Sequence, residues 1–208
     1  GRRFRPPQFL QRMLEGMSAA RVILRLLERL ADLAALAGGV TVLLLALLIG
    51  VDVVARKLLG VSVQGTDELG GYVLAMVGSL GMAHVLARRE FTRIDLLFRY
   101  LARPVRNLLH ALAYVTLAGL AVFMARHALI TLDDTLLFQS RANTPLRTPL
   151  WIPQGLWAGG MCFFALLAVI HAVRATVLMF AAPNRMAGEY GLARSEEAVA
   201  EYRGDSAR

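Results

Sequence analysis

Long apolar runs, separated by charged segments, dominate the pattern of this chain. The uncharged runs extend from Leu33 to Val51, Leu69 to Ala87, Leu108 to Ala125 and Thr148 to Val173. A helix needs about 20 apolar residues to cross a hydrocarbon core of about 30 Å. The pattern therefore predicts an all-α membrane protein with four transmembrane helices in a domain of residues 33–182. The predicted spans are about 33–55, 68–88, 105–132 and 154–180.

Two amphipathic stretches flank these spans. Residues 8–31 carry apolar side chains at helical spacing, which indicates a helix on the membrane surface within an interfacial segment of residues 1–32. The alternative is an extension of the first span into the cytoplasm that contacts another chain, and the sequence does not separate the two. The stretch from Ile94 to Arg103 is also predicted to lie along the interface. Residues 183–208 form a polar tail.

The basic residues predict the orientation of the spans. The segment before the first span, the loop after the second and the final segment hold seven, six and five of the 23 arginines and lysines, whereas the other two loops hold two and three. Basic loops stay on the cytoplasmic side, so both termini are predicted to be cytoplasmic. Orientation and attraction to anionic lipids account for the net charge of +8. No further signal for nucleic-acid binding is present in the sequence.

Two local patterns within the spans predict packing contacts. Asp52 and Arg56 are four residues apart, so a helix places them on one face as an ion pair near the outer surface. In the second span, small residues recur every fourth position, which predicts a face for close helix packing, either within this chain or with a partner. These small residues are Gly71, Ala75, Ser79 and Ala83.

Three motifs carry a resemblance to a known family. Glu68-Leu69 and Tyr72 open the second span, the run Arg89 to Leu97 follows it, and the run Thr144 to Pro153 precedes the fourth. In these motifs the chain resembles the small permease subunit, the DctQ-like subunit, of tripartite ATP-independent periplasmic (TRAP) transporters. Phe91 and Thr92 depart from the histidine and the apolar residue usual in that family.

The resemblance implies a bacterial inner-membrane complex for uptake of organic acids such as C4-dicarboxylates or sialic acids. A large membrane subunit would carry the substrate and sodium sites, and a periplasmic binding protein would deliver the substrate. This chain would be a non-enzymatic scaffold without cofactor or metal. The residues implied in assembly are Glu68, Tyr72, Glu90, Arg93 and Asp95. The candidates for docking of the binding protein, in the long outer loop, are Arg141, Arg147 and Trp151.

The residues of the spans also argue against a carrier site in this chain. Ion-coupled carriers place polar or charged groups near the middle of the membrane, next to interrupted helices. The acidic residues of the outer half lie at span ends, and no span has a central proline. Transport chemistry is therefore expected in another polypeptide.

Histidines provide the main alternative. His84, His110 and His171 all fall near the inner ends of their predicted spans, and paired imidazoles can hold haem in a four-helix bundle. A haem-binding, cytochrome-like subunit is thus the alternative function, although histidines near an interface are more often solvated or hydrogen-bonded. A serine protease using Ser79 ranks lower, because His84 five residues later points to a different helix face. A base from another helix, such as His110 or His171, stays open, but Ser79 has a simpler role in the small-residue stripe.

Overall fold

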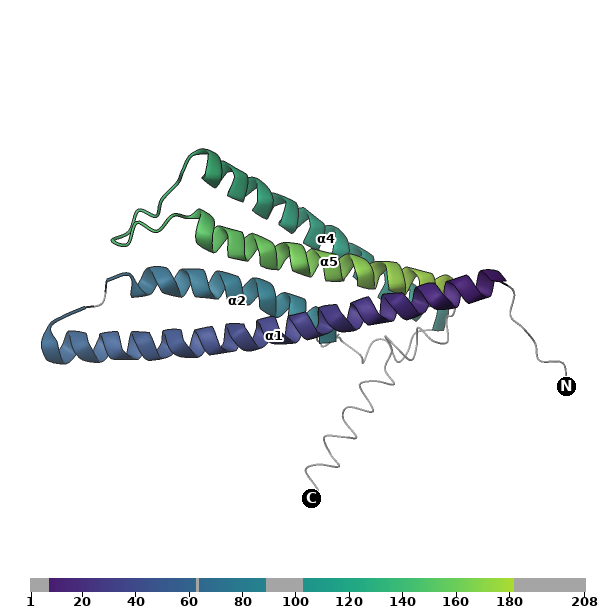
Figure 1. Ribbon diagram of the computed structural model, residues 1–208, viewed down its shortest axis with the longest axis horizontal. Coiled ribbons are helices and arrows are strands. Elements are labelled where there is room, and N and C mark those ends of the chain that lie inside the picture. Colours follow the sequence, from purple (N-terminus) through teal and green to yellow (C-terminus); the bar gives the residue numbers. More distant parts are fainter. Residues whose placement is uncertain (1–7, 63, 89–102, 182–208) are drawn as a thin grey trace, which may run out of the picture. The chain divides into compact units, whose positions relative to one another are not determined.

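The computed structural model is helical throughout its described membrane segments (Figure 1). It describes the backbone of residues 8–62, 64–88 and 103–181, with side chains for 24–62, 64–88 and 104–180. The helices of this described part are α1 (Gln8–Leu59), α2 (Thr66–Arg88), α4 (Arg103–Leu137) and α5 (Trp151–Ala181). Each contains a stretch long and apolar enough to cross a membrane, and no strand occurs among the described residues. The prediction of an all-α protein with four spans is confirmed.

The helices form two compact units, α1 with α2 and α4 with α5, and each unit is described by itself. In the first unit α1 is one continuous helix of 52 residues, so the amphipathic segment runs into the first span without a break. Whether residues 1–32 lie on the membrane surface stays a prediction. Of the second amphipathic stretch, residues 94–102 lie outside the described residues, and Arg103 begins α4.

Glycines mark both ends of the connection between α1 and α2. Gly60 follows the last residue of α1 with a φ of 68°, the left-handed conformation that commonly terminates helices. Gly65, with a φ of 91°, precedes the start of α2. Asp67 and Glu68 then occupy the first turn of α2, where the positive end of the helix dipole favours acidic side chains. The connection is thus short and forces the two helices to run antiparallel.

Small residues allow α1 and α2 to approach closely. A Cβ atom added to Gly38 of α1 would lie 3.4 Å from Cγ2 of Val77 in α2. The stripe of small residues predicted along α2 is divided between two environments, because Ser79 and Ala83 are buried whereas Gly71 and Ala75 are exposed. The buried half packs within the protein, and the exposed half leaves a face open to lipid or to a partner.

The second unit pairs α4 with α5 along a seam of small side chains. Buried residues of α4 recur every three or four positions, which is the spacing of a helix packed along one stripe against its neighbour. The alanines among them are Ala111, Ala118, Ala121, Ala125 and Ala128. The facing helix α5 buries small and large residues at the same spacing, including Ala158, Met161, Ala165, Ala168, Ala172 and Ala175. Small residues at such seams bring helix backbones close together.

The loop between α4 and α5 has a defined backbone. Gln139 adopts a φ of 50°, and the amide of Ser140 donates to the carbonyl of Thr135 at 3.1 Å, which closes α4 with a Schellman-type cap. Arg141 and Pro149 then form an isolated antiparallel bridge. Helix α5 starts at Trp151 and has Pro153 in its first turn, where proline is tolerated. The loop is therefore a short, hydrogen-bonded hairpin.

Most of the apolar surface of these helices is not covered by the protein itself. In the most apolar 18-residue stretch of each span, the share of residues that the protein itself buries ranges from 6% in α1 to 39% in α5. Leucine and valine side chains such as Leu43, Leu47, Val51 and Leu58 of α1 are more than half exposed. An apolar surface this extensive requires lipid or another protein around it, as expected of a membrane protein.

Candidate functional site

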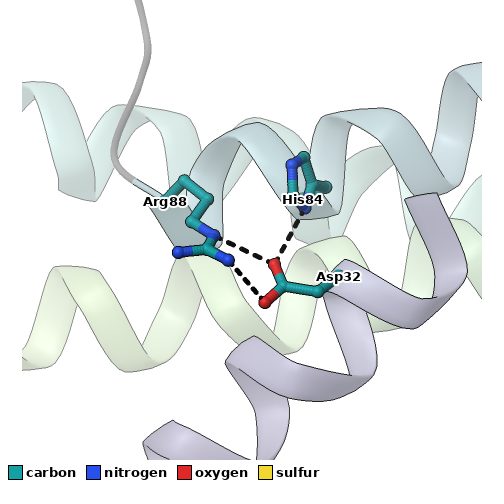
Figure 2. Close-up of polar contacts among 3 residues, drawn as sticks. All are labelled: Asp32, His84 and Arg88. Carbon is teal, nitrogen blue, oxygen red and sulfur yellow. Dashed lines mark hydrogen bonds and ion pairs between the residues drawn. The ribbon is translucent and has the colours of Figure 1, made fainter. Parts of the chain in front are cut away.

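A polar cluster of three side chains joins α1 to α2 (Figure 2). Arg88 donates from Nε to Oδ1 of Asp32 at 3.0 Å and from Nη2 to Oδ2 at 2.6 Å. Nδ1 of His84 lies 3.2 Å from the same Oδ1, an ion-pair distance when the imidazole is protonated, without the geometry of a hydrogen bond. Two parallel bonds from a guanidinium to a carboxylate fix the orientation of both groups.

The cluster marks one end of the paired segment of the two helices. Arg88 is the last residue of α2, and Asp32 directly precedes the uncharged run of α1 that begins at Leu33. The charges therefore meet where both helices leave the apolar region. Sequence reasoning missed Asp32. The usable signal was an acidic residue before the first span and a basic residue after the second, which an antiparallel hairpin brings to the same end.

A second ion pair marks the opposite end of the same hairpin. Nη2 of Arg56 lies 2.5 Å from Oδ2 of Asp52, which confirms the predicted pair within one helix. The carboxylate is almost fully buried, whereas the guanidinium is 60% exposed. Oγ of Ser62 donates to Oδ1 of Asp52 at 3.2 Å and so ties the connection to α1. Asp52 thus closes the turn between the helices.

Two of the residues implied in assembly contact each other. The hydroxyl of Tyr72 donates to Oε1 of Glu68 at 2.6 Å across one turn of α2. Both side chains are partly buried, and both belong to the motif that opens the second span. Glu90, Arg93 and Asp95 fall outside the described residues, so their contacts stay a prediction.

Buried aromatic and polar side chains gather in the α4–α5 unit. The rings of Tyr114 and His171 stack with centroids 6.0 Å apart, and His171 is fully buried. His110 and Asn107 are also buried and lie on the face of α4 that carries Tyr114. The sequence identified His110 and His171 but not the aromatic contact, because that contact depends on the register between two helices.

The three histidines of the haem alternative belong to two different units. His84 contacts Asp32 in the α1–α2 unit, while His110 and His171 lie in the α4–α5 unit. Within the described parts of the chain, no group of three or more histidine, cysteine or acidic side chains could hold a metal ion. Nothing in these contacts favours the haem alternative over helix packing.

The docking candidates lie at or beside the hairpin loop. Arg141 and Arg147 are exposed, and neither forms an ion pair or a side-chain hydrogen bond with a described residue. Neither arginine therefore pairs with Asp133 or Asp134, the acidic residues near the end of α4 that leads into the loop. The amide of Arg147 donates to the carbonyl of Thr144 at 3.0 Å, so this arginine sits on a structured backbone. Trp151 begins α5 and is about half exposed.

Comparison with family models identifies one match. Residues 45–178 match the family described as the DctQ component of tripartite ATP-independent periplasmic transporters. This range covers more than half of the chain and includes the second and third spans, nearly all of the fourth and the last part of the first. No curated protein and no solved structure matches the chain.

Proposed function

Because this chain belongs to the DctQ family of TRAP transporter components, we propose that it is the non-catalytic scaffold that supports the large membrane subunit. The family makes it the small subunit of a tripartite transporter, a multi-pass inner-membrane protein that works with a large membrane subunit and a binding protein. The scaffold role, sodium coupling and organic-acid substrates are the proposed part.

The continuity of the helices is the observation that carries the scaffold role. Carriers that couple ions to substrate use interrupted helices, whose exposed backbone groups bind ions near the middle of the membrane. Each helix in the described part of this chain runs without a break through its apolar window. In the α1–α2 unit the two ion pairs lie at opposite ends of the hairpin, and the apolar runs between them carry no charge. These contacts hold helices together and leave ion and substrate binding to the partner.

The large exposed apolar surface supports the same role. A scaffold has to offer a partner helix a face that its own helices do not cover, and α1 and α2 leave most of theirs open. The exposed glycine and alanine of α2, Gly71 and Ala75, form the kind of small-residue face that allows close packing of a second helix. We expect the large subunit to contact this part of the chain.

Reconstitution tests the scaffold role directly. Liposomes containing this chain alone, the large subunit alone or both would receive the binding protein, a sodium gradient and a panel of labelled C4-dicarboxylates and sialic acids. We expect uptake from the complex and none from this chain alone. Sodium-driven uptake by this chain alone contradicts the proposal, as does full activity of the large subunit in its absence.

The proposed orientation places both termini in the cytoplasm, and the arginine distribution supports it. Replacing Cys162, the single cysteine, by alanine gives a background for mapping the two sides. A membrane-impermeant maleimide should label Asn143→Cys in intact spheroplasts and Ala207→Cys only after lysis. The reverse pattern would overturn the orientation without affecting the scaffold role.

A further inference from the structure

An open groove runs along the surface of the α4–α5 unit, with a volume of about 510 Å³. Its residues all belong to α4 and α5, so the groove lies within one unit. Ala125 and Ala165, both buried, form its floor, and larger side chains such as Val122 and Leu166 stand beside them. The small residues of the helix seam thus leave a hollow that faces outward.

One charged side chain lies inside this apolar groove. Arg126 falls within the candidate span Pro104–Leu137 and is exposed. Among the described residues it forms no hydrogen bond and no ion pair. A charged group in a membrane span normally has a partner or a function. The five N–H donors of its guanidinium are therefore available to a group from outside the chain.

The length of the groove limits what can occupy it. Along α4 it extends from Val122 to Asp133, which at about 1.5 Å per residue is roughly 16 Å. This is about half of a hydrocarbon core of about 30 Å. The groove lies toward the end of α4 that leads into the hairpin loop, so it faces only one leaflet. A phospholipid occupies one leaflet, so the groove has the length that a single lipid requires.

The charges of the groove specify the lipid headgroup. Asp133 lies at the end of the groove nearest the loop, and Arg126 is seven residues deeper, about 10 Å along the helix. Arginine can extend its apolar stem so that the guanidinium reaches the headgroup level. A phosphate pairs well with a guanidinium, and an ammonium group pairs with a carboxylate. A zwitterionic phospholipid presents these two groups in the same order, with the phosphate nearer to the acyl chains.

We propose that this groove binds one phospholipid with an ammonium-bearing headgroup. The phosphate lies on Arg126, the ammonium group faces Asp133, and an acyl chain follows the apolar part of the groove along Val122, Leu166 and Val169. The lipid fills the hollow beside the α4–α5 seam. Binding does not depend on the scaffold role, because all contacts come from this chain.

Cys162 provides a natural probe of the site, since it is the only cysteine and lines the groove. The full chain would be stripped of lipid in detergent, and the rate of maleimide modification of Cys162 measured with and without palmitoyl-oleoyl phosphatidylethanolamine. At a lipid concentration about ten times Kd, we expect modification to slow by about tenfold. Native mass spectrometry should detect one retained lipid per chain.

Variants separate specific binding from general coverage by detergent or lipid. Arg126→Ala removes charge-assisted hydrogen bonds and should weaken lipid binding by about tenfold or more. Arg126→Lys should retain part of the affinity for lipid. Arg141→Ala, which removes a loop arginine outside the groove, should bind lipid as the unchanged chain does. Asp133→Asn should reduce the preference for phosphatidylethanolamine over phosphatidylglycerol. Circular dichroism and the lipid-free labelling rate report whether each variant is folded.

Two results would overturn the proposal. One is equal protection of Cys162 in the unchanged chain and in folded Arg126→Ala, which would mean that the arginine does not hold the lipid. The other is that the large subunit slows maleimide modification of Cys162 whereas no phospholipid does. That result would assign the groove to a helix of the partner. Lipid protection that depends on Arg126, with one lipid per chain, supports it.

Discussion

The guanidinium of Arg88 holds the carboxylate of Asp32 through two hydrogen bonds, of 3.0 and 2.6 Å, although the two residues are 56 positions apart. This contact connects the last residue of α2 to the point where α1 leaves its apolar run. At the other end of the hairpin, Asp52 connects α1 to Ser62 in the turn. The α1–α2 hairpin is therefore tied by polar contacts at both ends, with apolar helix surface between them.

The pair of Asp32 and Arg88 predicts measurable coupling between the helices. Asp32→Asn and Arg88→Ala should each lower the stability by about 0.5–1 kcal/mol, because half of the arginine side chain is exposed to solvent. For a chain of this size that corresponds to a decrease in Tm of about 1–4 °C. The double variant should cost less than the sum of the single variants. Thermal unfolding in detergent, followed by circular dichroism, measures all three.

Lys57→Ala is the matched control for this pair, since Lys57 is exposed and has no ion pair with a described residue. It should leave Tm unchanged. Strictly additive effects of Asp32→Asn and Arg88→Ala would show that the two side chains do not stabilise the hairpin through each other.

Local spacing explains which contacts the sequence could predict. The pair of Asp52 and Arg56 was predicted correctly, because a separation of four residues fixes the geometry within a single helix. Glu68 and Tyr72 share that spacing, and both were identified, although their hydrogen bond was not. The number of helices followed from the length of the apolar runs. All of these features depend on one helix at a time.

Contacts between helices required the structure. The ends of the apolar runs bring Asp32 and Arg88 to the same end of an antiparallel hairpin, but their contact depends on the register between the helices. The stacking of Tyr114 on His171 depends on register in the same way. The groove around Arg126 arises in the same way, from small residues of α4 and α5 at one level. Arg126 lies inside the predicted third span of residues 105–132, although it was counted with the basic residues that follow the third uncharged run, and α4 continues to Leu137.

The contacts of Asp52 predict that substitutions at Asp52 and Arg56 lower stability by different amounts. Asp52→Ala should destabilise the chain by about 1–3 kcal/mol, since it removes a buried carboxylate that accepts hydrogen bonds from both Ser62 and Arg56. Arg56→Ala should cost less, because the guanidinium is mostly exposed. Denaturant titration in detergent gives both values. Asp67→Ala, which removes an exposed acidic residue from the first turn of α2, is the control and should cost no more than about 0.3–1 kcal/mol through the helix dipole. A larger effect of Arg56→Ala than of Asp52→Ala contradicts this account.

The contact between Tyr72 and Glu68 predicts a role for a single hydroxyl group. Tyr72→Phe keeps the ring but removes the donor, and should lower stability by about 1 kcal/mol. Glu68→Gln retains an acceptor and should have a smaller effect. The family resemblance places both residues in an assembly motif, so the yield of the complex with the large subunit is the second measurement.

The control for Glu68→Gln is Glu28→Gln in α1. Glu28 has no hydrogen bond or ion pair with a described residue. If Tyr72→Phe leaves both Tm and the yield of the complex unchanged, the hydrogen bond has no role in folding or assembly.

The hairpin loop predicts an effect on transport rate without an effect on assembly. Arg141 and Arg147 are exposed, free of ion pairs with described residues and held on a hydrogen-bonded backbone, so their charges are available to a soluble partner. Reversing both to glutamate should slow uptake driven by the binding protein by about threefold to tenfold at low salt, because charges at the rim of an interface steer encounter. The difference should shrink near physiological salt, where the Debye length falls to about 8 Å. Lys57→Glu, the reversal of one charge at the end of α1, is the control outside the loop and should slow uptake less than the double reversal. Equal rates at low salt, with normal amounts of complex, would assign docking of the binding protein to the large subunit.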